Sequence, residues 1–134
     1  MNNRTFFLIL ILNIIFSITI TAQTDAKVIA VINHADWCPT CRKHSERAKA
    51  TFEKNNKDGS VLFLINNLTD KETRKISAIE LKKYGLDEAI AQYLGTGVTY
   101  FFNSETKLAI TQISLAKSDH ALVAALEAAK RGLK

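Results

Sequence analysis

Two uninterrupted apolar runs, residues 28–32 and 61–65, dominate the pattern of this 134-residue chain. Short apolar runs that are rich in β-branched residues predict strands buried on both faces. The stretch between them is mostly polar and charged, and it predicts a helix that begins at Pro39 and gives way to turn residues at 55–59. We therefore expect a β-α-β unit with two parallel strands.

Helical spacing characterises the next segment, residues 69–94. Thr69 and Glu72 have the spacing of a capping box and predict the start of a helix that stops near Gly85. A second, short helix follows and is broken at residues 95–97. The expected apolar positions are Ile76, Ile79 and Leu81 in the first helix and Leu86, Ile90, Tyr93 and Leu94 in the second.

The C-terminal third of the chain predicts a hairpin and a helix. Residues 98–102 and 108–113 have strand-like patterns, and the polar residues 103–106 between them predict the connecting turn. Ser118 and Asp119 are suited to cap a last helix, whose inward positions are Leu122, Leu126 and Ala129.

Both cysteines of the chain lie in the sequence Trp37-Cys38-Pro39-Thr40-Cys41, between the first apolar run and the first helix. Proline is favoured at the first helical position, so Cys38 is expected at the N-cap and Cys41 in the first turn, facing inward. A sulfur at the N-cap accepts hydrogen bonds from amides of the first turn and feels the positive end of the helix dipole. We therefore expect Cys38 to be an exposed nucleophile of lowered pKa and Cys41 to be a covered thiol that resolves the mixed disulfide.

The buried strand, the Trp-Cys-x-x-Cys turn and the following helix resemble the active-site unit of the thioredoxin superfamily, and the resemblance covers most of residues 27–131. It implies an α/β, thioredoxin-like fold with a four-stranded mixed sheet, made of a β-α-β unit, a helical insertion, a β-hairpin and a C-terminal helix. The segment between Ile65 and Tyr93 is longer than in thioredoxin by about one helix, and a similar insertion occurs in membrane-anchored, thioredoxin-like reductants of bacterial cell envelopes.

The resemblance also implies an activity: a protein-disulfide oxidoreductase that exchanges a Cys38–Cys41 dithiol or disulfide with protein substrates, without any other cofactor. Its partners would be protein thiols and disulfides and an unidentified redox partner. The residues expected to support the cysteines are Trp37, Pro39 and Thr40.

Two departures from the family pattern concern the surroundings of the cysteines. The family usually has a cis-proline before its third core strand, but here Gly97, Val98 and Thr99 occupy that place. A cis bond before a non-proline residue costs about 3 kcal/mol, so we expect a trans bond before Val98, with these three residues still offering a backbone edge to substrate. The family's buried aspartate is replaced by Ile32, which leaves water, or Asp36 and His34, as the nearest proton acceptors for Cys41.

The N-terminal segment predicts a secretory signal peptide over residues 1–22, followed by one thioredoxin-like domain over residues 23–134. An apolar run from Phe6 to Ile20 follows Arg4, and Ala22 provides a cleavage site. We therefore expect a periplasmic or secreted protein, or, if the segment is not cleaved, a protein anchored to the membrane at its N-terminus. The formal net charge of +5 is scattered over helical segments, which predicts no nucleic-acid surface.

Two other functions are compatible with the same residues. The first is a copper or zinc carrier that uses Cys38 and Cys41, with His34 and His44 as further ligands, although His44 lies away from Cys38 on the expected helix. The second is a redox-silent binding module whose disulfide only staples the helix start. The direction of electron flow is left open: Pro39 after Cys38 resembles periplasmic oxidases, whereas the short core and the insertion resemble envelope reductants.

Overall fold

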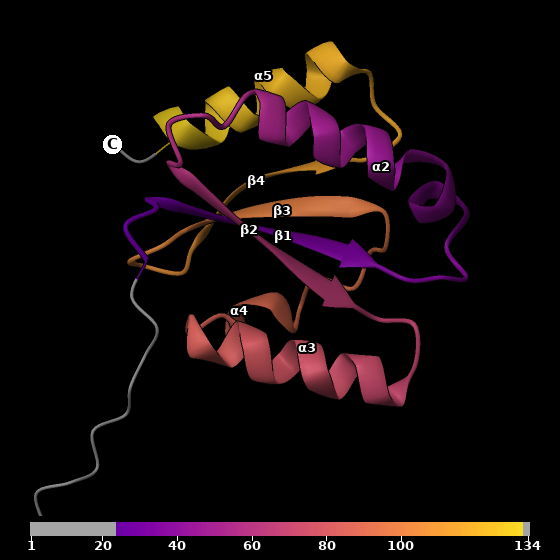
Figure 1. The fold of residues 1–134 in the computed structure, drawn as a ribbon. Helices are drawn as coiled ribbons and strands as arrows, with labels where there is room; N and C mark the ends of the chain where they lie inside the picture. Colours follow the sequence, from indigo (N-terminus) through magenta and orange to yellow (C-terminus); the bar gives the residue numbers. More distant parts are fainter. Residues whose placement is uncertain (1–23, 133–134) are drawn as a thin grey trace, which may run out of the picture.

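A four-stranded mixed sheet lies between two layers of helices, as Figure 1 shows for the computed structural model, which describes residues 24–132. Helices α2 and α5 cover one face of the sheet, and α3 and α4 cover the other. The elements, in chain order, are β1 (Val28–His34), α2 (Pro39–Lys54), β2 (Val61–Asn67), α3 (Lys71–Lys83), α4 (Asp87–Ile90), β3 (Val98–Asn103), β4 (Ala109–Ser114) and α5 (Asp119–Arg131). The expected fold class is confirmed.

The strands are ordered β2-β1-β3-β4 across the sheet. Strand β1 runs parallel to β2, as the β-α-β pattern predicts, and antiparallel to β3, while β3 and β4 form an antiparallel hairpin. The hairpin contains an irregularity between Phe101 and Phe102. Because β1 is central, both of its faces are covered, which explains its uninterrupted apolar sequence.

Alternate residues of the central strands fill two cores, one on each face of the sheet. The core beneath α2 and α5 contains Val28, Ala30, Ala48, Phe52, Val61, Phe101, Leu115, Leu122, Leu126 and Ala129. The core beneath α3 and α4 contains Ile29, Val31, Leu64, Leu81, Leu86, Ile90, Tyr100 and Phe102. The inserted helical segment therefore supplies most of the cover for one face of the sheet.

Helix α3 differs from the expectation at its start and in its buried face. Its N-cap is Asp70, which forms a capping box with Thr73, one residue later than the expected pair. Of its three expected apolar positions, Leu81 is buried, whereas Ile76 and Ile79 are exposed. The buried residues are Ser77 and Leu81, one turn apart, because the Ser77 hydroxyl accepts a hydrogen bond from the backbone N–H at the end of β2 and turns that face inward.

The second inserted helix is shorter than its apolar spacing predicts. Helix α4 ends at Ile90, and Leu94 beyond it is exposed. Within residues 24–132, the structure contains no helix with the length and apolar character that a membrane crossing requires. The expected signal peptide, residues 1–22, lies outside the described residues.

Candidate active site

The two cysteines lie where β1 passes into α2, after a three-residue turn. The Cys38 amide donates to the carbonyl of Ala35 at 3.0 Å, which closes the turn. Cys38 has an extended backbone, with φ −80° and ψ 116°, and is the N-cap of α2, with Pro39 at the first helical position. The predicted placement of Cys38 is therefore confirmed, and it follows from the preference of proline for a position whose amide has no partner in the helix.

The Cys38 sulfur accepts a hydrogen bond from the backbone N–H of Cys41 at 3.2 Å. Burial raises the pKa of the Cys38 thiol, but this effect is outweighed by hydrogen bonds from the side chains of Cys41 and Thr96 and from the amides of Cys41 and Thr40. The pKa of Cys38 is therefore lowered from its ordinary value. This agrees with the expected nucleophile, and it identifies Thr96 as a contributor that the sequence did not reveal.

Cys41 has the opposite character. Burial raises the pKa of its thiol. The hydrogen bond to Cys38 and the negative charge of the Cys38 thiolate raise this pKa further. Its sulfur lies 3.9 Å from the carbonyl oxygen of Asn33, which is a second acceptor for the thiol proton besides the Cys38 sulfur. A buried thiol that is neutral while its neighbour is ionised suits a residue that reacts second.

Cys38 is not exposed, contrary to the expectation from the sequence: its relative exposure is 3%, against 1% for Cys41. The cover comes from the loop before β3, which returns to the cysteines from the far end of the insertion. A Cβ on Gly97 would lie 3.4 Å from the Cys38 sulfur and 2.8 Å from Cγ2 of Thr40, and Gly97 has a φ of +71°. Only glycine allows both this close contact with Thr40 and Cys38 and a positive φ without strain.

Of the three residues expected to bind substrate, Gly97 lies beside Cys38, and the backbones of all three are already paired within the protein. The Gly97 N–H donates to the Asn33 carbonyl at 2.8 Å, and the Gly97 carbonyl accepts from the amide of Leu115 at 2.8 Å. Val98 and Thr99 begin β3 and pair with β1 on one side and β4 on the other. Their role in substrate binding stays a prediction.

The backbone before Val98 is trans, as expected, because residues 24–132 contain no cis peptide bond. Thr99 is fully buried, and within the described part of the chain its hydroxyl has no hydrogen-bond partner. It lies opposite Ile32 in the sheet register. The place of the family's aspartate is thus taken by an aliphatic side chain.

Asn33 joins both ends of the insertion and was missed by the sequence reasoning. It is fully buried at the end of β1. Its side-chain amide donates to the Tyr93 carbonyl at 2.7 Å, and its side-chain oxygen accepts from Nδ2 of Asn66 at 2.9 Å. The available signal was a polar residue directly after the apolar run 28–32, since a buried side-chain amide requires hydrogen-bond partners.

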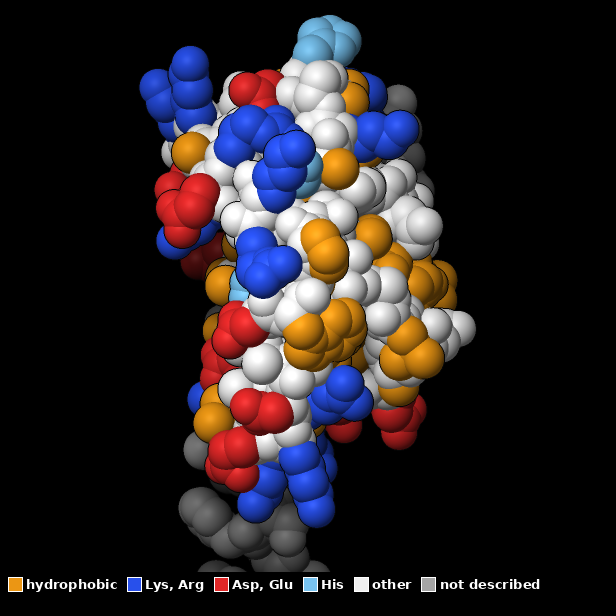
Figure 2. All heavy atoms as spheres, turned by 90° about the vertical axis from the view of Figure 1, so that its right-hand side faces the viewer, with side chains coloured by type: hydrophobic (Ala, Val, Ile, Leu, Met, Phe, Trp, Pro, Cys, Tyr) orange, Lys and Arg blue, Asp and Glu red, His pale blue; other side chains and the backbone are white. Residues whose placement is uncertain are grey.

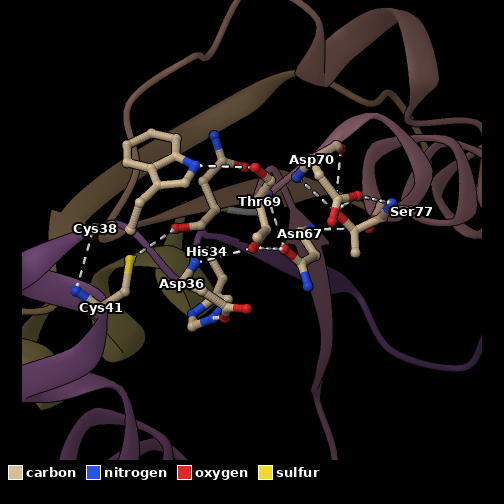
Figure 3. A network of polar contacts seen from close by, with 11 residues as sticks. His34, Asp36, Cys38, Cys41, Asn67, Thr69, Asp70 and Ser77 are labelled. Carbon is tan, nitrogen blue, oxygen red and sulfur yellow. Dashed lines mark hydrogen bonds and ion pairs between the residues drawn. The ribbon is translucent and has the colours of Figure 1, made fainter.

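A network of polar contacts connects the turn before Cys38 to the start of α3 (Figure 3). Nε2 of His34 lies 3.1 Å from Oδ1 of Asp36, so the two nearest candidate proton acceptors pair with each other. The Asp36 amide donates to the Thr69 hydroxyl at 3.0 Å, and the Trp37 indole N–H donates to the Thr69 carbonyl at 3.1 Å. Trp37 is 56% exposed.

In the part of the chain that the structure describes, His34 and His44 do not join the two cysteines in a metal-binding cluster. Among residues 24–132, no three His, Cys, Asp or Glu side chains lie close enough together to hold a metal ion. The two cysteines therefore lack the histidine ligands that the metal-carrier hypothesis added to them.

Figure 2 shows the end of the molecule where β1 finishes and α2 begins. Hydrophobic side chains lie in the middle of this face, and the half formed by α2 and α5 is richer in Lys and Arg than in Asp and Glu. The surface around the cysteines is therefore mixed in character rather than a single charged field.

The chain was compared with protein families, solved structures and curated proteins. A family model described as Thioredoxin matches residues 20–132. The solved structures similar to this chain include Trxlp from Edwardsiella tarda EIB202, with a TM-score of 0.49, 15% identity, and coverage of 75% of this chain and 82% of that chain. Tryparedoxin I from Leishmania major has a TM-score of 0.49, 19% identity, and coverage of 77% and 78% respectively. No curated protein matches the chain.

The family match spans well over half of the chain, including every helix and strand described above. The fold, together with two cysteines three residues apart, supports thiol-disulfide oxidoreductase chemistry in general. The chain belongs to the thioredoxin family.

Proposed function

We propose that this protein is a protein-disulfide oxidoreductase that works outside the cytoplasm and exchanges its Cys38–Cys41 pair with protein thiols and disulfides. The observation that carries the proposal is the contrast between the two thiols. Cys38, at the N-cap of α2, has a lowered pKa, whereas Cys41, one turn further on, has a raised pKa. Dithiol exchange requires one sulfur that is ready to attack and a second that attacks later.

The reaction divides into two exchanges. The Cys38 thiolate attacks one sulfur of a substrate disulfide, which forms a Cys38–substrate disulfide and releases the other substrate sulfur as a thiolate that takes up a proton. Cys41 then loses its proton and attacks the Cys38 sulfur, which forms the Cys38–Cys41 disulfide and releases the second substrate thiolate. Two electrons pass from the dithiol to the substrate, and the reverse sequence oxidises a substrate dithiol.

Ionisation of Cys41 is the step that receives the least help from other side chains of this protein. Its pKa is raised while Cys38 carries a charge, but formation of the mixed disulfide removes that charge and its effect on Cys41. The amides of Ala35 and Gly97 then favour the Cys41 thiolate. With Ile32 at the position of the family's aspartate, water takes the proton.

The extracytoplasmic location is proposed from residues 1–22, whose apolar run and Ala22 have the pattern of a secretory signal peptide. An oxidising compartment would also allow a single cysteine pair to cycle between dithiol and disulfide. Mass spectrometry of the protein produced in a secreting bacterial host tests this proposal. A mature chain beginning at Gln23 supports it, and an intact N-terminus in the cytoplasmic fraction contradicts it.

Single cysteine variants test the exchange chemistry. Cys41→Ser should accumulate a mixed disulfide through Cys38 when mixed with disulfide-bonded insulin, and Cys38→Ser should form none and reduce no insulin disulfides. Retention of most of the activity by both variants would contradict the proposal. Exchange with a small disulfide but not with insulin would leave the general chemistry in place and remove protein disulfides as substrates.

The reduction potential of the pair decides the direction of electron flow, which the geometry does not. Equilibration with glutathione or dithiothreitol buffers gives the value. A potential near or below about −250 mV assigns a reductant, and one above about −150 mV assigns an oxidant.

A further inference from the structure

The segment that joins β2 to α3 holds the end of β1 and the turn before Cys38 at three points. These hydrogen bonds run from the Leu68 amide to the His34 carbonyl at 2.7 Å, from the Asp36 amide to the Thr69 hydroxyl at 3.0 Å, and from the Trp37 indole to the Thr69 carbonyl at 3.1 Å. Thr69 makes two of the three. This turn is the only covalent link between β1 and the active-site helix, so its position sets that of the residues beside the sulfur.

Thr69 is itself fixed to helix α3 through its neighbours (Figure 3). Its hydroxyl donates to Oδ1 of Asn67 at 2.6 Å, and its amide donates to the same oxygen at 3.0 Å. The backbone N–H of Asn67 in turn donates to the hydroxyl of Ser77, which is buried on the inner face of α3. A continuous chain of hydrogen bonds therefore runs from Asp36 through Thr69 and Asn67 into α3.

The start of α3 is anchored independently. Asp70 and Thr73 form a reciprocal capping box, and Nε of Arg74 donates to the Leu68 carbonyl at 3.1 Å. Leu68 packs against the small cluster that contains both cysteine sulfurs and Ala35. The first turn of the inserted helix therefore supports one side of the redox pair.

Trp37 depends on this support because packing alone does not fix it. Its side chain is more than half exposed, and its indole N–H is bonded to Thr69. A large, amphipathic ring held in one orientation offers a contact surface at a small cost in conformational entropy. Directly before the nucleophile, such a ring lies where a disulfide-bearing substrate must approach.

We propose that Thr69 is a positioning residue: from the start of the inserted helix it fixes Asp36 and the Trp37 indole, so that the indole forms a preset substrate-binding surface beside Cys38. The inference rests on the proposed function for its substrate. Its geometric part, the fixing of Trp37, stands on the hydrogen bonds alone. The insertion is then part of the active site rather than only a cover for the sheet.

Three variants test this role. Thr69→Val keeps the shape of the side chain and the carbonyl that Trp37 uses, but removes the hydroxyl that links Asp36 to Asn67. Thr69→Ser keeps the hydroxyl. Thr111→Val is the matched control, since Thr111 is half-buried on β4 and its hydroxyl makes no side-chain hydrogen bond within residues 24–132.

Trp37 is the only tryptophan of the chain. Acrylamide quenching of tryptophan fluorescence therefore reports how freely the quencher reaches this one indole. We expect Thr69→Val to raise the quenching constant about twofold and the KM for insulin disulfides about fivefold, with kcat within about twofold, as for loss of a hydrogen bond that orients a binding surface. Thr69→Ser and Thr111→Val should resemble the wild type in both measurements.

The proposal is overturned if Thr69→Val, measured where urea titration shows it to be folded, has the quenching constant and KM of the wild type. It is also overturned if Thr69→Ser behaves like Thr69→Val, because the hydroxyl would then not matter. A wild-type protein that exchanges no disulfides would defeat the proposed function, while the quenching comparison would still decide whether Thr69 positions Trp37.

Discussion

At the scale of single residues, the two cysteines acquire different chemistry from one local cause, the start of helix α2. The sulfur of Cys38 lies outside the first turn and accepts its hydrogen bonds, whereas the sulfur of Cys41 lies within the turn and donates. Because Cys38 is also buried, hydrogen-bond donors rather than water stabilise its thiolate. A buried thiolate with fixed donors is stabilised only while the loop that covers it stays in place.

The pH dependence of alkylation checks this division of roles. In the reduced protein, modification of Cys38 by iodoacetamide should level off at a lower pH than modification of an ordinary thiol, because its pKa is lowered. Modification of Cys41 should follow only at higher pH. Peptide mapping after limiting modification distinguishes the two sites, and labelling of Cys41 first would contradict the assignment.

The lowered pKa of Cys38 also determines how the free energy of unfolding changes with pH. A folded-state pKa below the unfolded value gives Cys38 a contribution to the free energy of unfolding that is complete above the unfolded pKa. That contribution is lost as the pH falls through the folded-state pKa. The difference in unfolding free energy between the reduced protein and Cys38→Ser should therefore grow in favour of the reduced protein as the pH rises from the folded-state to the unfolded-state pKa of Cys38. Above that range the raised pKa of Cys41, to which Cys38 contributes, acts in the opposite direction.

At the scale of elements, the regular parts of the fold were predictable and the contacts between distant segments were not. The two parallel strands, helix α2 and the hairpin follow from apolar runs and turn residues, which are local signals. The burial of Cys38 depends on a loop some sixty residues away, and no local pattern reports it. The exposure of Ile76 and Ile79 could have been inferred from their positions, because at about 100° per residue they lie about 140° and 160° round the helix from the buried Leu81.

The loop that covers Cys38 provides a prediction at this scale, with an internal control. Gly97→Ala places a Cβ at a positive φ and 2.8 Å from Cγ2 of Thr40. Gly59 has a similar φ of +66°, but a Cβ there would meet nothing within 4 Å, so Gly59→Ala isolates the backbone strain. Strain alone should cost about 1 kcal/mol, and we expect Gly97→Ala to cost about 2–3 kcal/mol and to slow disulfide exchange.

Urea unfolding of both variants gives the comparison. Thr40→Ala should recover only part of the loss in Gly97→Ala, because it removes Cγ2 of Thr40, 2.8 Å from the new Cβ, but keeps Cβ of Thr40 at 2.9 Å. Equal costs for the two glycines would show that the close approach to Thr40 and Cys38 is unimportant.

At the scale of the whole molecule, the active site lies at the end of strand β1, where segments from both faces of the sheet come together. Helix α2 contributes the cysteines from one face of the sheet, and the insertion on the other face contributes the segment around Thr69 and the returning loop at Gly97. Both ends of the insertion reach β1 at Asn33, through the side chains and backbone described above. The sequence predicted an inserted helix between Ile65 and Tyr93, but a buried amide that binds both ends of the insertion arises only in the assembled fold.

Asn33 therefore provides the prediction that concerns the molecule as a whole. Asn33→Leu preserves the approximate size of the side chain but leaves Nδ2 of Asn66 and the Tyr93 carbonyl without their partner. Each buried polar group left unpaired costs about 1–3 kcal/mol, so the free energy of unfolding should fall by about 2–4 kcal/mol. Asn33→Leu combined with Asn66→Leu should lose less than the sum of the two single changes, because both partners of one hydrogen bond are then apolar.

The alkylation profile separates this structural role from the chemistry at the sulfurs. The carbonyl of residue 33, which accepts from Gly97 and lies near the Cys41 thiol, is unchanged by the substitution, and the donors to Cys38 lie on α2 and at Thr96. We therefore expect Asn33→Leu to unfold at a lower urea concentration yet to keep the pH midpoint of Cys38 alkylation. A midpoint shifted towards that of an ordinary thiol would show instead that the Asn33 amide, by holding the end of the insertion, keeps the Gly97 loop and Thr96 over Cys38, and the stability and the reactivity of this protein would then depend on the same side chain.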